Sequence, residues 1–182
     1  MAEVGLLAPD LRVELIEGAI IDVPSMRPPD AAILSRLNSL VTPLADIHVN
    51  VRVRLPLRLG EFSEPTPDLA LVKHRSDHYI GSHPTPSDAL LVVEVNQGSL
   101  RFDYTHKLPL YSRHEVPEVW LVDVNKLVLH VFQMPQGGRY RHASSTPQPG
   151  IVNLRVMPNA KLDLTGLFEG LRPTLPSPTF PR

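Results

Sequence analysis

The order of apolar and polar residues along the chain predicts short strands mixed with helices. The first strongly apolar segment is typical of two strands joined by a turn at Glu17-Gly18. Apolar residues then recur at helical spacing, which predicts a helix from about residue 30 to 45 with Asp30 as its N-cap. From residue 47 to 55 the pattern changes to strict alternation, so we expect a half-buried strand with one polar face.

The most apolar segment lies near the middle of the chain. Residues 89–95 are almost all apolar, as in a strand buried on both faces, and the polar residues 73–88 before them predict a surface excursion. A helical segment is expected within about residues 103–114, where Pro109 should kink the helix or delay its start. Further strands are predicted at residues 68–72, 119–124, 126–133, 139–141 and 151–156, with a hairpin turn at Gly137-Gly138.

These elements predict one α/β domain with a central mixed β-sheet flanked by helices. The domain is expected to span residues 1–170. Residues 171–182 contain four prolines, so we expect a disordered tail there. No internal repeat is present in the sequence.

Composition narrows the class of protein only in part. The 182 residues contain no cysteine, which excludes disulfides and thiolate metal sites. The net charge of -1 does not indicate a nucleic-acid binder, although a local basic face can still neutralise phosphates. The first ten residues do not resemble a signal peptide, and no apolar run approaches the roughly 20 residues that cross a membrane. We therefore expect a soluble, cytoplasmic protein.

Glu94 is the first candidate for chemistry. It is the only charged residue in a strand that otherwise looks fully buried. Burial of an unpaired carboxylate costs several kcal/mol, so Glu94 should be paired, metal-bound or protonated. The alternatives are a structural ion pair, or a strand end that reaches solvent.

Asp68 and Lys107 are the other two candidates. Asp68 follows Pro67 and opens a strand, so its carboxylate would project at the mouth of the sheet; it could also be a turn or cap residue. Lys107 lies in the helical segment that leaves the Glu94 strand and could fold back over the strand end. The alternative is a solvated lysine on a helix surface.

Taken together, these three residues predict a site for a hard divalent cation. Magnesium takes one or two carboxylates and keeps several waters. A cation held by Asp68 and Glu94 would polarise a phosphate oxygen and lower the pKa of a bound water. Lys107 would orient that water or stabilise charge on the phosphate.

This arrangement resembles the PD-(D/E)xK nuclease superfamily and, more narrowly, the Uma-two family of restriction-endonuclease-like proteins. The resemblance covers roughly residues 10–170. It is carried by the segments VELIEGAIIDVP (13–24), EPTPDLALV (64–72), HPTPSDALLVVEV (83–95) and SLRFDYTHKLPLYSRHEVPEVWLVDV (99–124).

The resemblance implies a restriction-endonuclease-like fold and a role for each matching residue. Asp68 and Glu94 would bind the metal, and the backbone carbonyl of Val95 would complete its shell. Lys107 would be the catalytic lysine. Glu14 would lie near the site, with an outward-facing strand residue as the alternative. The implied activity is that of an endonuclease that depends on Mg2+ or Mn2+ and cleaves DNA, with a homodimer expected because cutting both strands needs two centres.

The sequence departs from the family pattern at two places. Family members often carry a histidine where this chain has Asp30. After Glu94 the family usually has small polar or acidic residues, and here the residues are Asn96, Gln97 and Gly98; Asn96 also stands where the superfamily places its lysine. The change after Glu94 favours one alternative, a non-catalytic module that binds or interacts. A hydrolase of another phosphoester would share the same metal chemistry and is a further alternative.

Weaker signals come from histidine and arginine pairs. His74 and His78 are spaced like zinc ligands on a helix, but no third ligand follows, so we interpret them as loop residues. Two arginine pairs share strand faces and could contact phosphates, although ordinary exposed charges are the favoured interpretation; they are Arg52 with Arg54 and Arg139 with Arg141.

Overall fold

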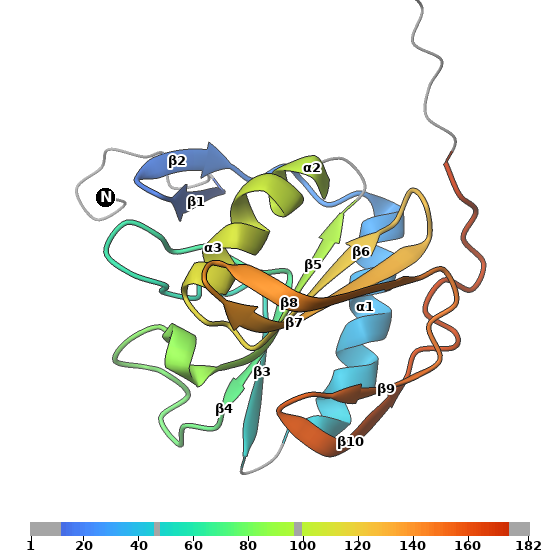
Figure 1. Cartoon of the computed structure of the whole chain (residues 1–182). Coiled ribbons are helices and arrows are strands. Elements are labelled where there is room, and N and C mark those ends of the chain that lie inside the picture. Colours follow the sequence, from blue (N-terminus) through green and yellow to red (C-terminus); the bar gives the residue numbers. More distant parts are fainter. Residues whose placement is uncertain (1–11, 46–47, 97–99, 175–182) are drawn as a thin grey trace, which may run out of the picture.

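A six-stranded mixed sheet forms the centre of the computed structural model, which describes residues 12–45, 48–96 and 100–174 (Figure 1). The strand order is β3-β4-β5-β6-β7-β8, and only the neighbours β5 and β6 run parallel. The strands are β3 (Val49–Val53), β4 (Leu69–Lys73), β5 (Ala89–Asn96), β6 (Glu118–Asp123), β7 (Val128–Gln136) and β8 (Arg139–Thr146). The predicted α/β class with a mixed sheet is confirmed.

Helices cover both faces of this sheet. On one face lies α1 (Pro28–Val41), followed by the 3-10 turn η1 (Thr42–Leu44). The other face is covered by a helical segment made of α2 (Leu100–Phe102), the π-helical turn η3 (Asp103–Lys107) and α3 (Leu108–Arg113). This segment joins β5 to the parallel strand β6, because parallel neighbours need a crossover connection.

Alternation along β5 divides the core into two layers. Leu91 and Val93 pack with α1, whereas Val92 packs beneath α3 against Leu110 and Tyr111. Both faces of β5 are therefore apolar, which explains its nearly unbroken hydrophobic run. Since side chains alternate along a strand, Glu94 points to the same face as Val92, toward the helical segment.

Two hairpins pack outside the central sheet. The first, β1 (Val13–Ile16) with β2 (Ala19–Asp22), turns at Glu17 and Gly18, whose φ angles of 50° and 83° suit a tight two-residue turn, as predicted. The second, β9 (Ile151–Leu154) with β10 (Met157–Asp163), contributes Leu154 and Leu162 to the α1 layer. The strand β10 was not predicted. A 3-10 turn, η2 (Pro86–Asp88), precedes β5.

The start of α1 corrects one sequence prediction. Arg27, not Asp30, is the N-cap, and Pro28 and Pro29 occupy the first turn. Proline fits there because its missing N–H has no helical partner at that position. Asp30 is instead the third helical residue, and its Oδ2 accepts a hydrogen bond from the Arg27 backbone N–H at 3.3 Å.

The irregularity predicted at Pro109 is present. The helical segment begins at Leu100, and its π-helical turn ends at Lys107, two residues before Pro109. Proline cannot donate to a carbonyl in the preceding turn, and a wider turn accommodates that loss.

The first residues of the predicted tail, 171–174, lie within the described part of the chain. Thr174 N donates a hydrogen bond to the Asn125 carbonyl oxygen at 2.8 Å. The rest of the predicted tail, residues 175–182, lies outside the described residues. Within the described ranges, the protein contains no helix with the length and apolar character needed to span a membrane.

Candidate active site

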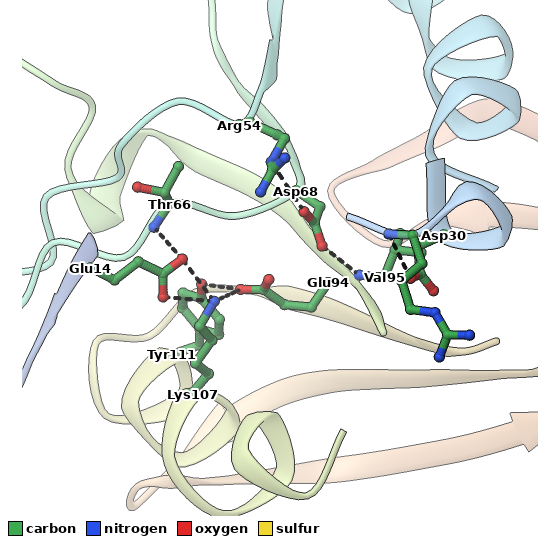
Figure 2. A network of polar contacts seen from close by, with 10 residues as sticks. Glu14, Asp30, Arg54, Thr66, Asp68, Glu94, Val95, Lys107 and Tyr111 are labelled. Carbon is green, nitrogen blue, oxygen red and sulfur yellow. Dashed lines mark hydrogen bonds and ion pairs between the residues drawn. The ribbon is translucent and has the colours of Figure 1, made fainter. Parts of the chain in front are cut away.

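A cavity of about 360 Å3 opens where the β1-β2 hairpin, the C-terminal end of β5 and the helical segment meet. Its lining includes four of the residues that the sequence indicated: Glu14, Asp68, Glu94 and Lys107 (Figure 2). Residues separated by up to 93 positions in the sequence therefore meet in one place. The backbone of Val95 lines the same cavity.

Glu94 is held by two donors from the helical segment. Its Oε1 accepts hydrogen bonds from Lys107 Nζ at 3.1 Å and from Tyr111 Oη at 2.6 Å. The two donors are four residues apart, so both point to the same side of the helix. Because both reach Oε1, the second oxygen, Oε2, remains for a further ligand.

Glu14 holds Lys107 from the opposite side. Lys107 Nζ lies 3.0 Å from Glu14 Oε1 and 2.9 Å from Oε2, and the backbone N–H of Thr66 also donates to Oε1 at 3.2 Å. Only 3 % of Glu14 and 7 % of Lys107 are exposed. The alternative of an outward-facing Glu14 is therefore wrong, as is that of a solvated Lys107.

Asp68 reaches the same cavity through strand pairing. Leu69 pairs with Val93 across β4 and β5, so the next pair along the antiparallel register sets Asp68 opposite Glu94. Asp68 Oδ2 accepts the Val95 N–H at 2.9 Å. The N–H and C=O of one residue in a strand point to the same edge, which directs the Val95 carbonyl toward Asp68 as well.

Arg54 also lines the cavity, although the favoured interpretation from sequence was an ordinary exposed charge. Its Nε lies 3.7 Å from Asp68 Oδ1. Its φ of 51° places the backbone in the left-handed region directly after β3, which turns the side chain toward Asp68. Arg52 is instead held near the Tyr79 ring, at 5.5 Å from its centroid, and Arg139 and Arg141 are exposed on β8.

Two further buried residues belong to the polar network of this site. Tyr111 is fully buried, as expected of a core aromatic, but its hydroxyl binds Glu94. Asp103 is a buried acid within the helical segment and accepts a hydrogen bond from the Asn96 side-chain amide. Asn96 thus contacts a carboxylate where the superfamily places its lysine, and residues 97–99 lie outside the described part of the chain.

Burial and the neighbouring charges set the protonation states. Burial raises the pKa of Glu94 well above its usual range, although Lys107 opposes the shift. The pKa values of Asp68 and Asp103 are also raised by burial, that of Asp103 to about 6. Burial lowers the pKa of Lys107, but the neighbouring charges of Glu94 and Glu14 raise it by more, so the net shift is upward. The two carboxylates thus favour the charged form of Lys107.

The donors present fit a hard divalent cation. Asp68, Glu94 and the Val95 carbonyl offer only oxygen atoms, which suit Mg2+ or Mn2+. Among the described residues, no three acidic, cysteine or histidine side chains come close enough to hold one ion together. Two carboxylates with the remaining positions filled by water is the usual arrangement for magnesium.

The histidine pair does not form a comparable site. His74 and His78 lie on a connecting segment, with ring centroids 6.1 Å apart and their planes nearly perpendicular. His78 Nδ1 contacts the Asn50 side chain at 3.2 Å. The interpretation of both as loop residues is consistent with these contacts.

The fold and the comparisons agree on the class of this protein. A crystal structure described as that of "a putative nuclease belonging to DUF820" from Anabaena variabilis has the same fold, with a TM-score of 0.66 and 18 % sequence identity over 91 % of this chain and 94 % of that one. The central sheet and its helices are thus those of a restriction-endonuclease-like nuclease fold.

The family follows from the sequence match. The model of the Uma2 (Uma-two) family, described as "Putative restriction endonuclease", matches residues 2–165, and the chain belongs to this family. The comparison with functionally curated proteins gave no match.

Proposed function

We propose that this protein is a metal-dependent endonuclease that hydrolyses phosphodiester bonds in DNA with Mg2+ or Mn2+. The observation that supports it most is the buried Glu14–Lys107–Glu94 network beside Asp68 in an open cavity. Because desolvation offsets much of the attraction, a lysine enclosed between two carboxylates adds little net stability, which favours a role for these charges beyond stability. The family of the chain points to the same activity.

Each side chain has a definite task in this proposal. Asp68 and Glu94 hold the cation, with the Val95 carbonyl. When bound, the cation supplies a polarised phosphate oxygen and an acidified water. Lys107 keeps its proton, since Glu94 and Glu14 stabilise the charge; it stabilises negative charge on the phosphate and does not act as a base.

Glu14 and Tyr111 keep the site in order in this proposal. Glu14 fixes the Lys107 ammonium, and Tyr111 fixes one oxygen of Glu94. Rigid second contacts of this kind hold metal ligands and catalytic groups in a productive geometry. A homodimer would supply the two centres that a cut through both DNA strands requires.

A non-catalytic binding module is the second candidate. It is favoured by Asn96, which contacts Asp103 at the position where the superfamily has its lysine. Lys107 occupies the site from the helix instead and directly contacts Glu94. Because a charged donor is present next to the metal-binding carboxylates, we favour the nuclease.

The test combines metal titration with plasmid nicking. The parent should bind Mg2+ or Mn2+ and nick DNA. Lys107→Ala removes a transition-state donor and should reduce the nicking rate by about 100-fold or more. Glu94→Gln removes a metal-binding carboxylate and should reduce the rate by at least as much. Lys126→Ala is the matched control, because the Lys126 side chain is 77 % exposed on the surface. Its rate should equal that of the parent.

Two results would contradict the proposal in different ways. Equal nicking by the parent and by the Glu94 and Lys107 variants would exclude this cavity as the active site. A folded parent that neither binds metal nor nicks DNA would favour the binding module. Far-ultraviolet circular dichroism of every variant separates lost activity from lost folding.

A further inference from the structure

Asp30 is a buried acid that lines the same cavity but has no part in the chemistry described above. Only 6 % of the residue is exposed. It is the one α1 residue among those that line the cavity in the described chain. Figure 2 draws it near Val95, from a different element than Glu14 or Lys107.

The two carboxylate oxygens of Asp30 have different surroundings. Oδ2 accepts the Arg27 N–H and so completes the start of α1. Oδ1 is fully buried and has no hydrogen-bond partner among the described residues. A residue in the first helical turn needs only one oxygen for capping. Since a buried polar atom without a partner is costly, Oδ1 needs another explanation.

The position of Asp30 indicates what Oδ1 binds. No three acidic or histidine side chains in the described part of the chain are close enough to ligate one ion, so Asp30 does not join Asp68 and Glu94 in a single inner shell. A carboxylate outside that inner shell would interact with the ion through a hydrogen bond from one of its bound waters. Magnesium retains several waters when it binds to protein, and these waters donate hydrogen bonds.

We propose that Asp30 Oδ1 accepts a hydrogen bond from the hydration shell of the cation held by Asp68 and Glu94. Asp30 is then a positioning residue that orients this shell and raises the affinity of the site for the cation. This inference rests on the proposed function. Loss of such an outer-shell partner typically weakens metal binding by about 10- to 100-fold.

The test is a titration of metal-free protein with Mn2+, followed by electron paramagnetic resonance of the free ion. The Asp30→Asn variant keeps an oxygen for the Arg27 N–H but loses the charge and the acceptor at Oδ1. Its Kd for Mn2+ should rise by about 10- to 100-fold. Its urea unfolding midpoint without metal should not fall below that of the parent, because the cap is retained.

Asp88 provides a matched control. It holds the same third position in η2, and its Oδ2 accepts the Thr85 N–H at 2.8 Å, but it is not among the cavity residues. Asp88→Asn should leave the Kd for Mn2+ unchanged.

The outcomes separate this inference from the proposed function. A parent and an Asp30→Asn variant with equal Mn2+ affinity would overturn the role of Asp30 and leave the nuclease proposal standing. An Asp30→Asn variant whose urea midpoint falls together with its Mn2+ affinity would show a folding role and also overturn it. A parent that neither binds Mn2+ nor nicks DNA would overturn both.

Discussion

At the scale of single residues, the centre of the site is a lysine between two glutamates. Each carboxylate alone would be unstable in a buried position, and Lys107 offsets both because it contacts both. The cost of this arrangement makes it sensitive to small changes. Removal of any one partner leaves the others short of a hydrogen bond or a charge.

Removal of the Tyr111 hydroxyl tests how far the stability of the protein depends on this network, without disturbing the packing of the ring. Tyr111→Phe keeps the buried ring and removes only the hydrogen bond to Glu94. Because the acceptor is a carboxylate, we expect the free energy of unfolding to fall by about 2 kcal/mol, measured by urea denaturation. Tyr140→Phe is the control, since the Tyr140 hydroxyl donates to the neutral Val116 carbonyl. Its loss should be about 1 kcal/mol. Equal losses would argue that Glu94 carries no charge.

At the scale of elements, a buried acid outside the candidate site joins β6 to the β9-β10 hairpin. Glu118 is fully buried at the start of β6. Its Oε1 accepts the Trp120 indole N–H at 2.7 Å, and its Oε2 accepts the Arg155 backbone N–H at 2.8 Å, in the turn between β9 and β10. One carboxylate thus fixes the hairpin against the central sheet.

Replacement of Glu118 should therefore loosen the hairpin. Glu118→Gln places an amide donor against one of two N–H groups, and we expect a loss of about 2–3 kcal/mol in the free energy of unfolding. Trp120 is the only tryptophan, so its fluorescence during urea unfolding reports this region directly. The exposed Glu115 provides the control, and Glu115→Gln should change stability by less than about 0.5 kcal/mol. A similar effect of both substitutions would contradict the assigned role.

At the scale of the whole molecule, the cavity concentrates buried negative charge. Burial, with smaller contributions from the charges of Asp68 and Glu14, raises the pKa of Asp103 to about 6, although Lys107 and the hydrogen bond from Asn96 oppose this shift. Between the ordinary value of 3.8 and about 6, folded Asp103 holds a proton that the unfolded chain has lost. Its contribution to stability is therefore lost as the pH rises through this window.

This expected loss of stability with rising pH can be tested by unfolding experiments in EDTA. Asp103→Asn removes the titration, so the stability of this variant relative to the parent should increase from pH 4 to pH 6 and then level off. Urea midpoints at pH 4, 5, 6 and 7 measure the difference. Asp163→Asn is the control, because the pKa of Asp163 is lowered and it titrates below this window. A constant difference between the Asp103 variant and the parent would contradict the raised pKa.

Local periodicity was sufficient to predict most elements and two members of the site. Alternation and helical spacing are properties of neighbouring residues, so they predicted the strands, α1 and the irregular helix at Pro109. Glu94 stood out because a charge interrupts an apolar strand, and Asp68 because it opens the neighbouring strand. The family pattern added Glu14 and Val95 to the prediction and gave the strongest reason for including Lys107.

The remaining features depend on how distant segments pack. The contact between Glu14 and Lys107 spans 93 positions, and no local pattern determines that the β1-β2 hairpin docks against the helical segment. Asp30 looked like an N-cap because a cap needs only nearby backbone, whereas its orphan oxygen becomes visible only inside the folded cavity. The sequence by itself determined most of the helices and strands. It also singled out Glu94 and Asp68 as acidic residues in or beside apolar strands. The tertiary structure decided which of them meet, because those contacts arise from packing between segments and not from spacing along the chain.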